Sequence, residues 1–401
     1  MLFDPRRHEP LGATAWDEDR ARTTIARIAR DTEAGFDHDR WWPMHPLDAD
    51  GGPRAAVFPL YFGACGVVWA LHYLAAMGAA TAGRDFRDDS ARVLPLNRGW
   101  LAASGSDDLA SYLMGDTSIL MLRHALDPCA DVLDELHQLI VGNIDNPTRE
   151  LMWGSPGTML ASLLLYRHTG EARFADAFVA TARILKSQLL HSREFDCDYW
   201  TQDMYGETSS YIDAVHGFVG TALPVIGGRD LLAPHEWNDW EARIVDTVAR
   251  TATRDGALVN WRPWLYPATA ERPLLMQYCH GAPGFVVCLG ELPGTALDEL
   301  LIGAGEAIWT AGPLRKGSNL CHGTAGNGYA FLKLHRRTGD ARWLARARAF
   351  AMHAIDQFEE HAQRYGQLRY SLWTGDLGLA IYLWNCIQGE AAFPTLDVFF
   401  A

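Results

Sequence analysis

The sequence predicts an all-α fold, an α/α toroid in which a ring of seven inner helices is surrounded by a ring of seven outer helices. A glycine motif, G-x-x-G, recurs at seven places along the 401 residues, once in a degraded form. An apolar stretch follows each copy, and amphipathic, charged segments lie between the copies. Such an alternation is typical of helical hairpins that bury their apolar members against their neighbours.

The glycine motifs mark the expected starts of the inner helices. Their first glycines are Gly63, Gly115, Gly154, Gly217, Gly281, Gly323 and Gly375. The successive spacings of 52, 39, 63, 64, 42 and 52 residues leave room for two helices in every interval. The segments 158–166 and 330–334, which follow two of the motifs, are apolar nearly all round, as buried helices are. We therefore expect all the glycine turns at one rim of the ring.

The outer helices are predicted from apolar residues at i, i+3 and i+4 with charges between them. The segments with this pattern are 17–34, 129–141, 171–190, 237–253, 295–311 and 340–363. We interpret residues 1–401 as one domain, whose N-terminal 50 residues form an outer helix and an extension. The Pro- and Trp-rich stretch 261–273 is expected to form a rigid loop at the rim, either as a wall of a site or as an inert insertion.

Charge and cysteine content restrict the partners and the location. A formal net charge of −14 without a Lys/Arg cluster disfavours nucleic acid. No run of 18 apolar residues occurs, so no membrane insertion is expected. The first residues lack a basic region followed by an apolar one, and the seven cysteines are scattered, which favours reduced thiols. These features predict a cytoplasmic protein.

Two of the glycine motifs begin with a Cys-His pair. Cys279-His280 and Cys321-His322 both read C-H-G-x-x-G and lie 42 residues apart. Thiolates and neutral imidazoles are the ligands that Zn²⁺ prefers, and three protein ligands with an open fourth position describe a catalytic site. A following helix N-terminus lowers the pKa of a thiol. Because the spacing is not that of a zinc finger, the ligands must converge through the fold. The alternative is that these residues only pack in the core.

With these motifs the chain resembles the lanthionine synthetase C-like (LanC-like) family over residues 55–390. The most specific parts are residues 279–284 and 320–327. The resemblance implies an α/α toroid with one zinc ion held by Cys279, Cys321 and His322, so that His280 is not a ligand. Cyclases of the family usually carry Tyr at the position of His280, whereas glutathione-binding members carry His. The chain is therefore more similar to the glutathione-binding members.

Two further residues, His216 and Glu150, stand at positions that carry functional residues in the family. His216, in A-V-H-G, stands where the family has a histidine that acts as acid or base. Glu150, four residues before a rim glycine, stands where cyclases have Asp and glutathione-binding members have Glu. The alternative for His216 is a hydrogen-bonded core histidine. For Glu150 the alternative is a carboxylate that only stabilises a helix N-terminus.

Lys316 matches a lysine that contacts glutathione in the glutathione-binding members. A plain solvated lysine is the alternative. Two departures from those members leave the substrate open: Thr374 replaces their Glu before the last glycine motif, and Tyr278 replaces their usual Trp.

The implied groups suit the addition of a thiol to an activated alkene. A thiol at the fourth position of the zinc ion loses its proton and remains nucleophilic. Its addition to the β-carbon of dehydroalanine or dehydrobutyrine produces an enolate that must be protonated at the α-carbon. His216 or His280 is suited to this proton transfer, because an imidazole titrates near neutral pH. Glu150 could orient or stabilise an imidazolium.

Three functions follow from this chemistry. The first is an enzyme that joins a thiol, either glutathione or a peptide cysteine, to a dehydroamino acid on a peptide or protein. The second is a stand-alone lanthionine cyclase that acts on a dehydrated precursor peptide. The third is a non-catalytic module that binds zinc and glutathione. An α/α-barrel carbohydrate enzyme is a more distant alternative, because such an enzyme needs two catalytic carboxylates and no Cys-His pairs.

Overall fold

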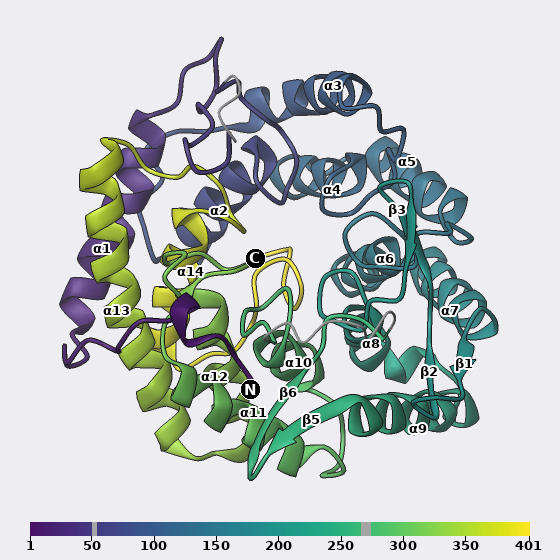
Figure 1. Cartoon of the computed structure of the whole chain (residues 1–401). Helices are drawn as coiled ribbons and strands as arrows, with labels where there is room; N and C mark the ends of the chain where they lie inside the picture. The colour runs from purple at the N-terminus through teal and green to yellow at the C-terminus, as the bar shows by residue number, and fades with distance from the viewer. Residues whose placement is uncertain (50–53, 266–273) are drawn as a thin grey trace.

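The computed structural model describes residues 1–49, 54–265 and 274–401. Within these ranges fourteen α-helices form two concentric rings (Figure 1). The inner helices are α2 (Ala64–Ala76), α4 (Asp116–Leu126), α6 (Ser155–Thr169), α8 (Phe218–Gly227), α10 (Ala282–Leu289), α12 (Thr324–Thr338) and α14 (Asp376–Gln388). The outer helices are α1 (Glu18–Ala34), α3 (Arg87–Ala103), α5 (Ala130–Gly142), α7 (Ala172–Ser187), α9 (Pro234–Thr251), α11 (Asp298–Ala311) and α13 (Ala341–Tyr365). The predicted toroid is confirmed.

One outer helix, α3, is not predicted by the amphipathic pattern. Its buried residues are Asp89, Ser90, Val93, Asn97 and Leu101. Because polar side chains occupy much of the face that packs inward, the apolar periodicity of this segment is weak. Pro95 in the middle of the helix weakens the signal further.

The part of the chain that the structure describes also contains three two-stranded antiparallel hairpins, which the sequence patterns do not predict. They are β1–β2 (Leu190–Ser192 and Cys197–Tyr199), β3–β4 (Gln202–Met204 and Glu207–Ser209) and β5–β6 (Ala252–Asp255 and Leu258–Trp261). Strands of three or four residues are too short to show alternation in a sequence. All three hairpins lie between Gly154 and Gly281, so they account for the two longest spacings in the glycine pattern.

Each inner helix begins at a short segment that we call a rim turn. The seven rim turns are residues 59–63, 111–115, 150–154, 213–217, 277–281, 319–323 and 371–375, each ending at the first glycine of a motif. Six of the motifs have a second glycine, which allows the helix to pack on its own turn. A Cβ on Gly326, for example, would lie 1.8 Å from the carbonyl oxygen of Leu320. Close backbone approach therefore explains the G-x-x-G pattern.

Backbone hydrogen bonds join neighbouring rim turns and close the ring. Cys279 N–H donates to the carbonyl of Cys321 at 3.1 Å, and Cys321 N–H donates to that of Trp373 at 2.9 Å. Trp373 N–H in turn donates to the carbonyl of Tyr61 at 3.0 Å, which joins the last rim turn to the first. Residues that are far apart in the sequence are thereby held side by side at the rim.

The C-terminal segment lies at the centre of the ring (Figure 1). Phe393 is fully buried, and its ring stacks on that of Tyr278 at 4.8 Å between centroids. The Tyr112 hydroxyl donates to the carbonyl of Thr395 at 2.5 Å, and the Trp69 indole N–H donates to that of Phe399 at 2.8 Å. The inner helices therefore converge on a packed centre beneath the rim turns.

The expected rigid loop at residues 261–273 is described only in part. Residues 266–273 lie outside the described residues. Before them, the carbonyl of Pro263 accepts a hydrogen bond from Ile212 N–H at 2.8 Å, and Leu265 N–H donates to Ser210 at 3.0 Å. The start of this loop thus lies against the approach to the fourth rim turn.

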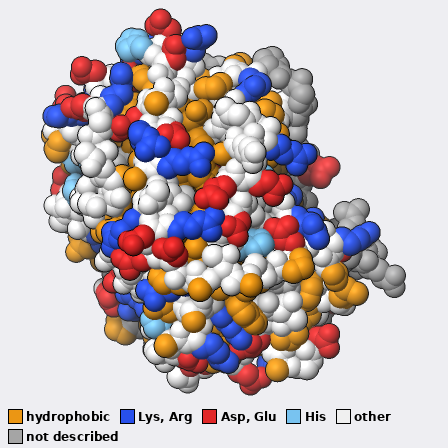
Figure 2. Space-filling view, turned by 90° about the vertical axis from the view of Figure 1, so that its left-hand side faces the viewer, with side chains coloured by type: hydrophobic (Ala, Val, Ile, Leu, Met, Phe, Trp, Pro, Cys, Tyr) orange, Lys and Arg blue, Asp and Glu red, His pale blue; other side chains and the backbone are white. Residues whose placement is uncertain are grey.

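The outer surface formed by α1 and α13 mixes charges of both signs. Figure 2 shows the side formed by α1 and α13, where acidic and basic side chains alternate without a block of either sign. Arg20 of α1, for example, contacts Asp356 and Glu359 of α13 at 2.8 Å each. Among the helices that the structure describes, none combines the length and the apolar character that crossing a bilayer requires.

Candidate metal centre and active site

Two neighbouring rim turns bring three candidate metal ligands together. The Sγ atoms of Cys279 and Cys321 and a ring nitrogen of His322 all lie within 4.8 Å of one another. Both cysteines are buried, and His322 is partly buried. The hydrogen bond from Cys279 N–H to the Cys321 carbonyl fixes the two turns in register. The predicted ligands therefore converge, although 42 residues separate the two cysteines.

The two thiols form a coupled pair with defined hydrogen bonds. The Tyr61 hydroxyl donates to Cys321 Sγ at 2.7 Å, and Gln277 Nε2 donates to Cys279 Sγ at 2.9 Å. A hydrogen bond from the Cys279 thiol, together with that from Tyr61, lowers the pKa of Cys321 although burial opposes this. The same hydrogen bond, followed by burial, raises the pKa of Cys279. Cys321 is thus the thiol that ionises first.

His322 is held as a neutral imidazole. Burial, followed by the positive charges of Lys316 and Arg369, lowers the pKa of His322 to about 3. A neutral imidazole and two thiols that can ionise are the donors that Zn²⁺ prefers, and three of them leave a fourth position open. The donor chemistry of this cluster therefore fits a zinc ion.

A histidine–carboxylate pair lies beside the cluster. His216 Nδ1 is 2.9 Å from Glu150 Oε2, and Glu150 is fully buried in the third rim turn. Glu150 also accepts hydrogen bonds from the backbone N–H groups of Met152 and Trp153. Burial lowers the pKa of His216, but the hydrogen bond and the charge of Glu150 outweigh it, so the pKa is raised overall. Glu150 therefore stabilises the imidazolium form of His216.

A second pair of the same kind involves His280. Its Nδ1 is 2.5 Å from Oδ2 of Asp213, which is fully buried. Burial lowers the pKa of His280, but the charges of Asp213 and Cys279 and the Asp213 hydrogen bond raise it to about 9. The two imidazole rings face a common space, with centroids 6.4 Å apart, and Tyr211 stacks on His280 at 6.1 Å.

Asp213 is the functional candidate that the sequence patterns missed. Like Glu150, it stands four residues before a rim glycine, and its Oδ1 accepts a hydrogen bond from His216 N–H in its own turn at 2.9 Å. In both pairs the carboxylate of one rim turn holds the histidine of the next. Comparing the same position in all seven turns would have found it.

Lys316 is placed at the other side of the cluster. It lines a small cavity with Arg369, His45, His361 and Asn319. The Nδ2 atom of Asn319 is buried and has no hydrogen-bond partner among the described residues. Lys316 and Arg369 both exert their charge on Cys321 and His322. Lys316 therefore lies next to the candidate metal ligands, in a cavity that also holds Asp376 and Arg369, the latter paired with Asp48.

Comparison with known proteins gives the family of the chain. A family model described as lanthionine synthetase C-like protein matches residues 58–398. The chain belongs to the LanC-like family. This LanC-like chain is 27% identical over 322 residues to a Danio rerio protein named glutathione S-transferase LANCL1, with 72% of the chain and 74% of the relative covered. It is 28% identical over 263 residues to LanC-like protein GCL1 of Arabidopsis thaliana, with 62% of the chain and 58% of the relative covered.

A solved structure shares the fold of this LanC-like chain. Nisin cyclase superposes with a TM-score of 0.59 over 92% of the chain and 93% of the cyclase, at 15% sequence identity. At this identity the likeness concerns the α/α toroid alone. The relative found by sequence is thus named a glutathione S-transferase, and the protein found by fold is named a cyclase.

Proposed function

We propose that this LanC-like chain is a zinc-dependent enzyme that adds a thiol, in the first place that of glutathione, to dehydroalanine or dehydrobutyrine in a peptide or protein. The observation that carries the proposal is the convergence of Cys279, Cys321 and His322 within 4.8 Å, beside two histidine–carboxylate pairs. A metal-binding donor set with an open position and two imidazoles that face one space suit a nucleophilic addition followed by protonation.

The zinc site would consist of Cys279, Cys321 and His322. When bound, zinc would supply the positive charge that lowers the pKa of a thiol in the open fourth position. The hydrogen bonds of Tyr61 and Gln277 to the two sulfur atoms would fix the ligands, as outer hydrogen-bond partners do at metal sites. His280 would not be a ligand, because Asp213 holds its ring on the substrate side.

Glutathione as the thiol is supported by the charges around the cluster. Its two carboxylates need cationic partners, and Lys316, which exerts its charge on His322, is one. Arg369 lines the same cavity as Lys316, but it is already paired with Asp48. The unpaired Nδ2 group of Asn319 offers a further buried donor. The Danio rerio relative, whose printed name is glutathione S-transferase, points in the same direction.

The reaction needs no oxidant or reductant. The thiol loses its proton, the sulfur atom forms a bond to the β-carbon, and the π electrons of the alkene move to the α-carbon as an enolate. A proton then joins the α-carbon, so that a thioether forms and the proton count balances. His216 and His280 are the candidates for the two proton transfers: a neutral imidazole can accept the thiol proton, and an imidazolium can give a proton to the α-carbon. Glu150 and Asp213 would act as positioning residues that keep each ring oriented and favour its cationic form.

Two other functions use the same site. A stand-alone lanthionine cyclase would join a cysteine and a dehydroamino acid of one precursor peptide, and the likeness to nisin cyclase keeps this candidate open at the level of fold. A non-catalytic module would bind zinc and glutathione without turnover. His280 and the position of Lys316 beside the candidate metal ligands favour the glutathione reaction over cyclisation.

We also propose that residues 1–401 act as one domain in the cytoplasm. The family model covers residues 58–398, which include all the candidate site residues. All seven cysteines are free, as expected of a chain in a reducing compartment.

The proposed function is tested by incubating the zinc-loaded protein with glutathione and a dehydroalanine peptide that lacks cysteine. Mass spectrometry should detect the sum of the two reactant masses. A second peptide, with an internal cysteine and no added glutathione, tests cyclisation: loss of its free thiol at constant mass would favour the cyclase. If neither peptide reacts while zinc and glutathione bind, the non-catalytic alternative replaces the proposal.

A further inference from the structure

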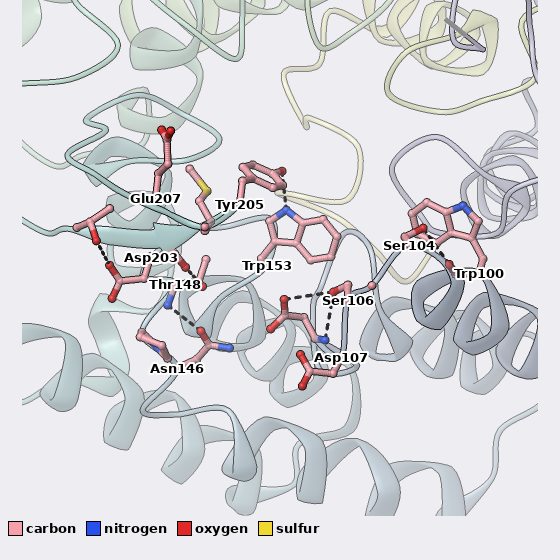
Figure 3. A pocket seen from close by; sticks show the side chains of 16 residues that line it. Trp100, Ser104, Ser106, Asp107, Asn146, Thr148, Trp153, Asp203, Tyr205 and Glu207 are labelled. Atoms are coloured by element: carbon pink, nitrogen blue, oxygen red, sulfur yellow. Dashed lines mark hydrogen bonds between the residues drawn. The ribbon is translucent and has the colours of Figure 1, made fainter. Parts of the chain in front are cut away.

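An acidic, aromatic groove opens at the rim (Figure 3). Its volume is about 880 Å³, and it lies between the end of α3, the approach to the third rim turn and the β3–β4 hairpin. The aromatic side chains in its wall are Trp100, Trp153 and Tyr205, and the carboxylates are Asp107, Asp108, Asp203 and Glu207. None of its sixteen described lining residues is Lys or Arg. The groove thus presents four carboxylates without a compensating cation in its wall.

The groove is connected to the candidate active site through two aromatic residues. Trp153 belongs to the third rim turn, and its indole N–H donates to the Tyr205 hydroxyl at 2.8 Å. Tyr205, at the tip of the β3–β4 hairpin and 71% exposed, contacts the His216 ring edge to face at 6.4 Å between centroids. A chain that lies in the groove would therefore pass directly to the histidine pairs.

The carboxylates of the groove are available to a ligand. Asp203 accepts a hydrogen bond from Thr208 at 2.7 Å, and Asp108 accepts one from Ser106 at 3.3 Å. The carboxylates of Asp107 and Glu207 have no hydrogen-bond or ion-pair partner among the described residues. Burial, together with the charges of Asp107 and Glu150, raises the pKa of Asp108. A bound cation would relieve this repulsion.

The groove continues beyond the first cavity. A second cavity of about 590 Å³ shares Asp107, Asp108 and Asn146 with it and extends over α5. A single residue would fill only a small part of this length, whereas an extended segment of several residues would occupy both cavities. The cationic side chains of the site, Lys316 and Arg369, lie instead beside His322. Lys316, which has no ion-pair partner among the described residues, thus lies near the metal ligands, and the uncompensated carboxylates lie in the groove.

We propose that this groove binds the acceptor chain, as an extended peptide segment with Lys or Arg residues close to the dehydroamino acid. This inference rests on the proposed function and specifies its peptide substrate. The carboxylates would pair with the cationic side chains, and Trp100, Trp153 and Tyr205 provide faces on which such side chains can lie. Glutathione and the acceptor would then approach the histidine pairs from regions of opposite charge.

The test compares two labelled peptides that differ only in their flanking residues, Lys or Glu, around a central alanine in place of dehydroalanine. Because these peptides cannot react, their binding is measured without turnover, by fluorescence anisotropy with the zinc-loaded protein. The groove variant is Asp107→Asn with Glu207→Gln. The matched control is Glu194→Gln with Asp246→Asn, which removes two exposed carboxylates elsewhere on the chain.

The wild type and the control should bind the Lys peptide with similar affinity and the Glu peptide more weakly. The groove variant should lose about fivefold in affinity for the Lys peptide, as expected for the loss of two solvent-accessible ion pairs. Equal affinity of the wild type for both peptides, or an unchanged affinity of the groove variant, would overturn the inference. Failure of the proposed reaction is seen separately, as the absence of adduct from dehydroalanine peptides that do bind.

Discussion

Glu150 and His216 belong to successive rim turns, and Oε2 of Glu150 lies 2.9 Å from Nδ1 of His216. Asp213 and His280 repeat this relationship one turn further along. The ring thus uses the same position of its repeat to cap a turn and to orient the imidazole of the following turn. Two such pairs beside the candidate zinc ligands give the site its proposed proton-transfer groups.

Glu150→Gln should shift the pH dependence of thiol addition. The pKa of His216 in the folded protein is raised above 6.5, its value in the unfolded chain. The contribution of the Glu150–His216 pair to folding stability is therefore fully present below pH 6.5, and it is lost as the pH rises through the raised pKa. If the His216 imidazolium protonates the α-carbon, activity falls over the same range. The substitution removes the charge that raises the pKa, so the fall should move to lower pH. The rate of adduct formation is measured as a function of pH for the wild type, for Glu150→Gln and for the control Glu194→Gln. If the pH profile of Glu150→Gln equals that of the wild type, Glu150 and His216 do not take part in the proton transfer.

Tyr61→Phe should weaken metal binding. The hydroxyl of Tyr61 donates to Cys321 Sγ at 2.7 Å and stabilises the thiolate. Loss of an outer hydrogen-bond partner of this kind lowers metal affinity by about 10- to 100-fold. Competition with a chromogenic zinc chelator measures the affinity, and Tyr73→Phe in α2 serves as the control. Equal affinities of Tyr61→Phe and the wild type would show that the hydroxyl does not support the metal site.

Phe393→Ala should destabilise the whole ring. Phe393 is fully buried in the centre and contacts the rings of Tyr278, Tyr329 and Trp373. Removal of a buried phenylalanine side chain costs about 3–5 kcal/mol in the free energy of unfolding. Denaturant unfolding followed by circular dichroism tests this, with the exposed Leu47→Ala as comparison. A loss below 1 kcal/mol, on the order of a surface change, would contradict a packed centre.

Cys279→Ala and Cys321→Ala should each lower the zinc content of the purified protein sharply. Each substitution removes one of three ligands, and the remaining two cannot hold the ion tightly. Metal analysis by mass spectrometry should give one zinc per wild-type chain. Cys288→Ala, a buried cysteine of α10 outside the cluster, should retain it. The absence of zinc from the wild type as well as from the variants would contradict the ligand assignment.

Much of the ring could be predicted because a recurring glycine motif marks the start of each inner helix. Gly66 and Gly326 are required by close backbone contacts inside each turn, so their recurrence reveals the inner helices. The outer helix α3 could not be predicted, because the polar residues Asp89, Ser90 and Asn97 occupy its buried face. The hairpins could not be predicted, because strands of three or four residues are too short to show an alternation of apolar and polar residues.

The candidate site was predictable where a residue type is itself distinctive. The C-H-G-x-x-G pairs and His216 stand out by type and by place, and the structure brings them together at the rim. Asp213 and Tyr61 do not stand out, because a carboxylate or a tyrosine near a turn is common in any sequence. Their contacts depend on which rim turns become neighbours, and Tyr61 meets Cys321 only because the ring closes.

The rate of glutathione adduct formation on a dehydroalanine peptide, compared between zinc-loaded and metal-stripped protein, tests the central claim most directly. We predict adduct formation well above the rate without protein when zinc is bound, loss of that acceleration after metal removal, and recovery when zinc is restored. An equal rate in the loaded, stripped and protein-free samples would contradict the proposed function.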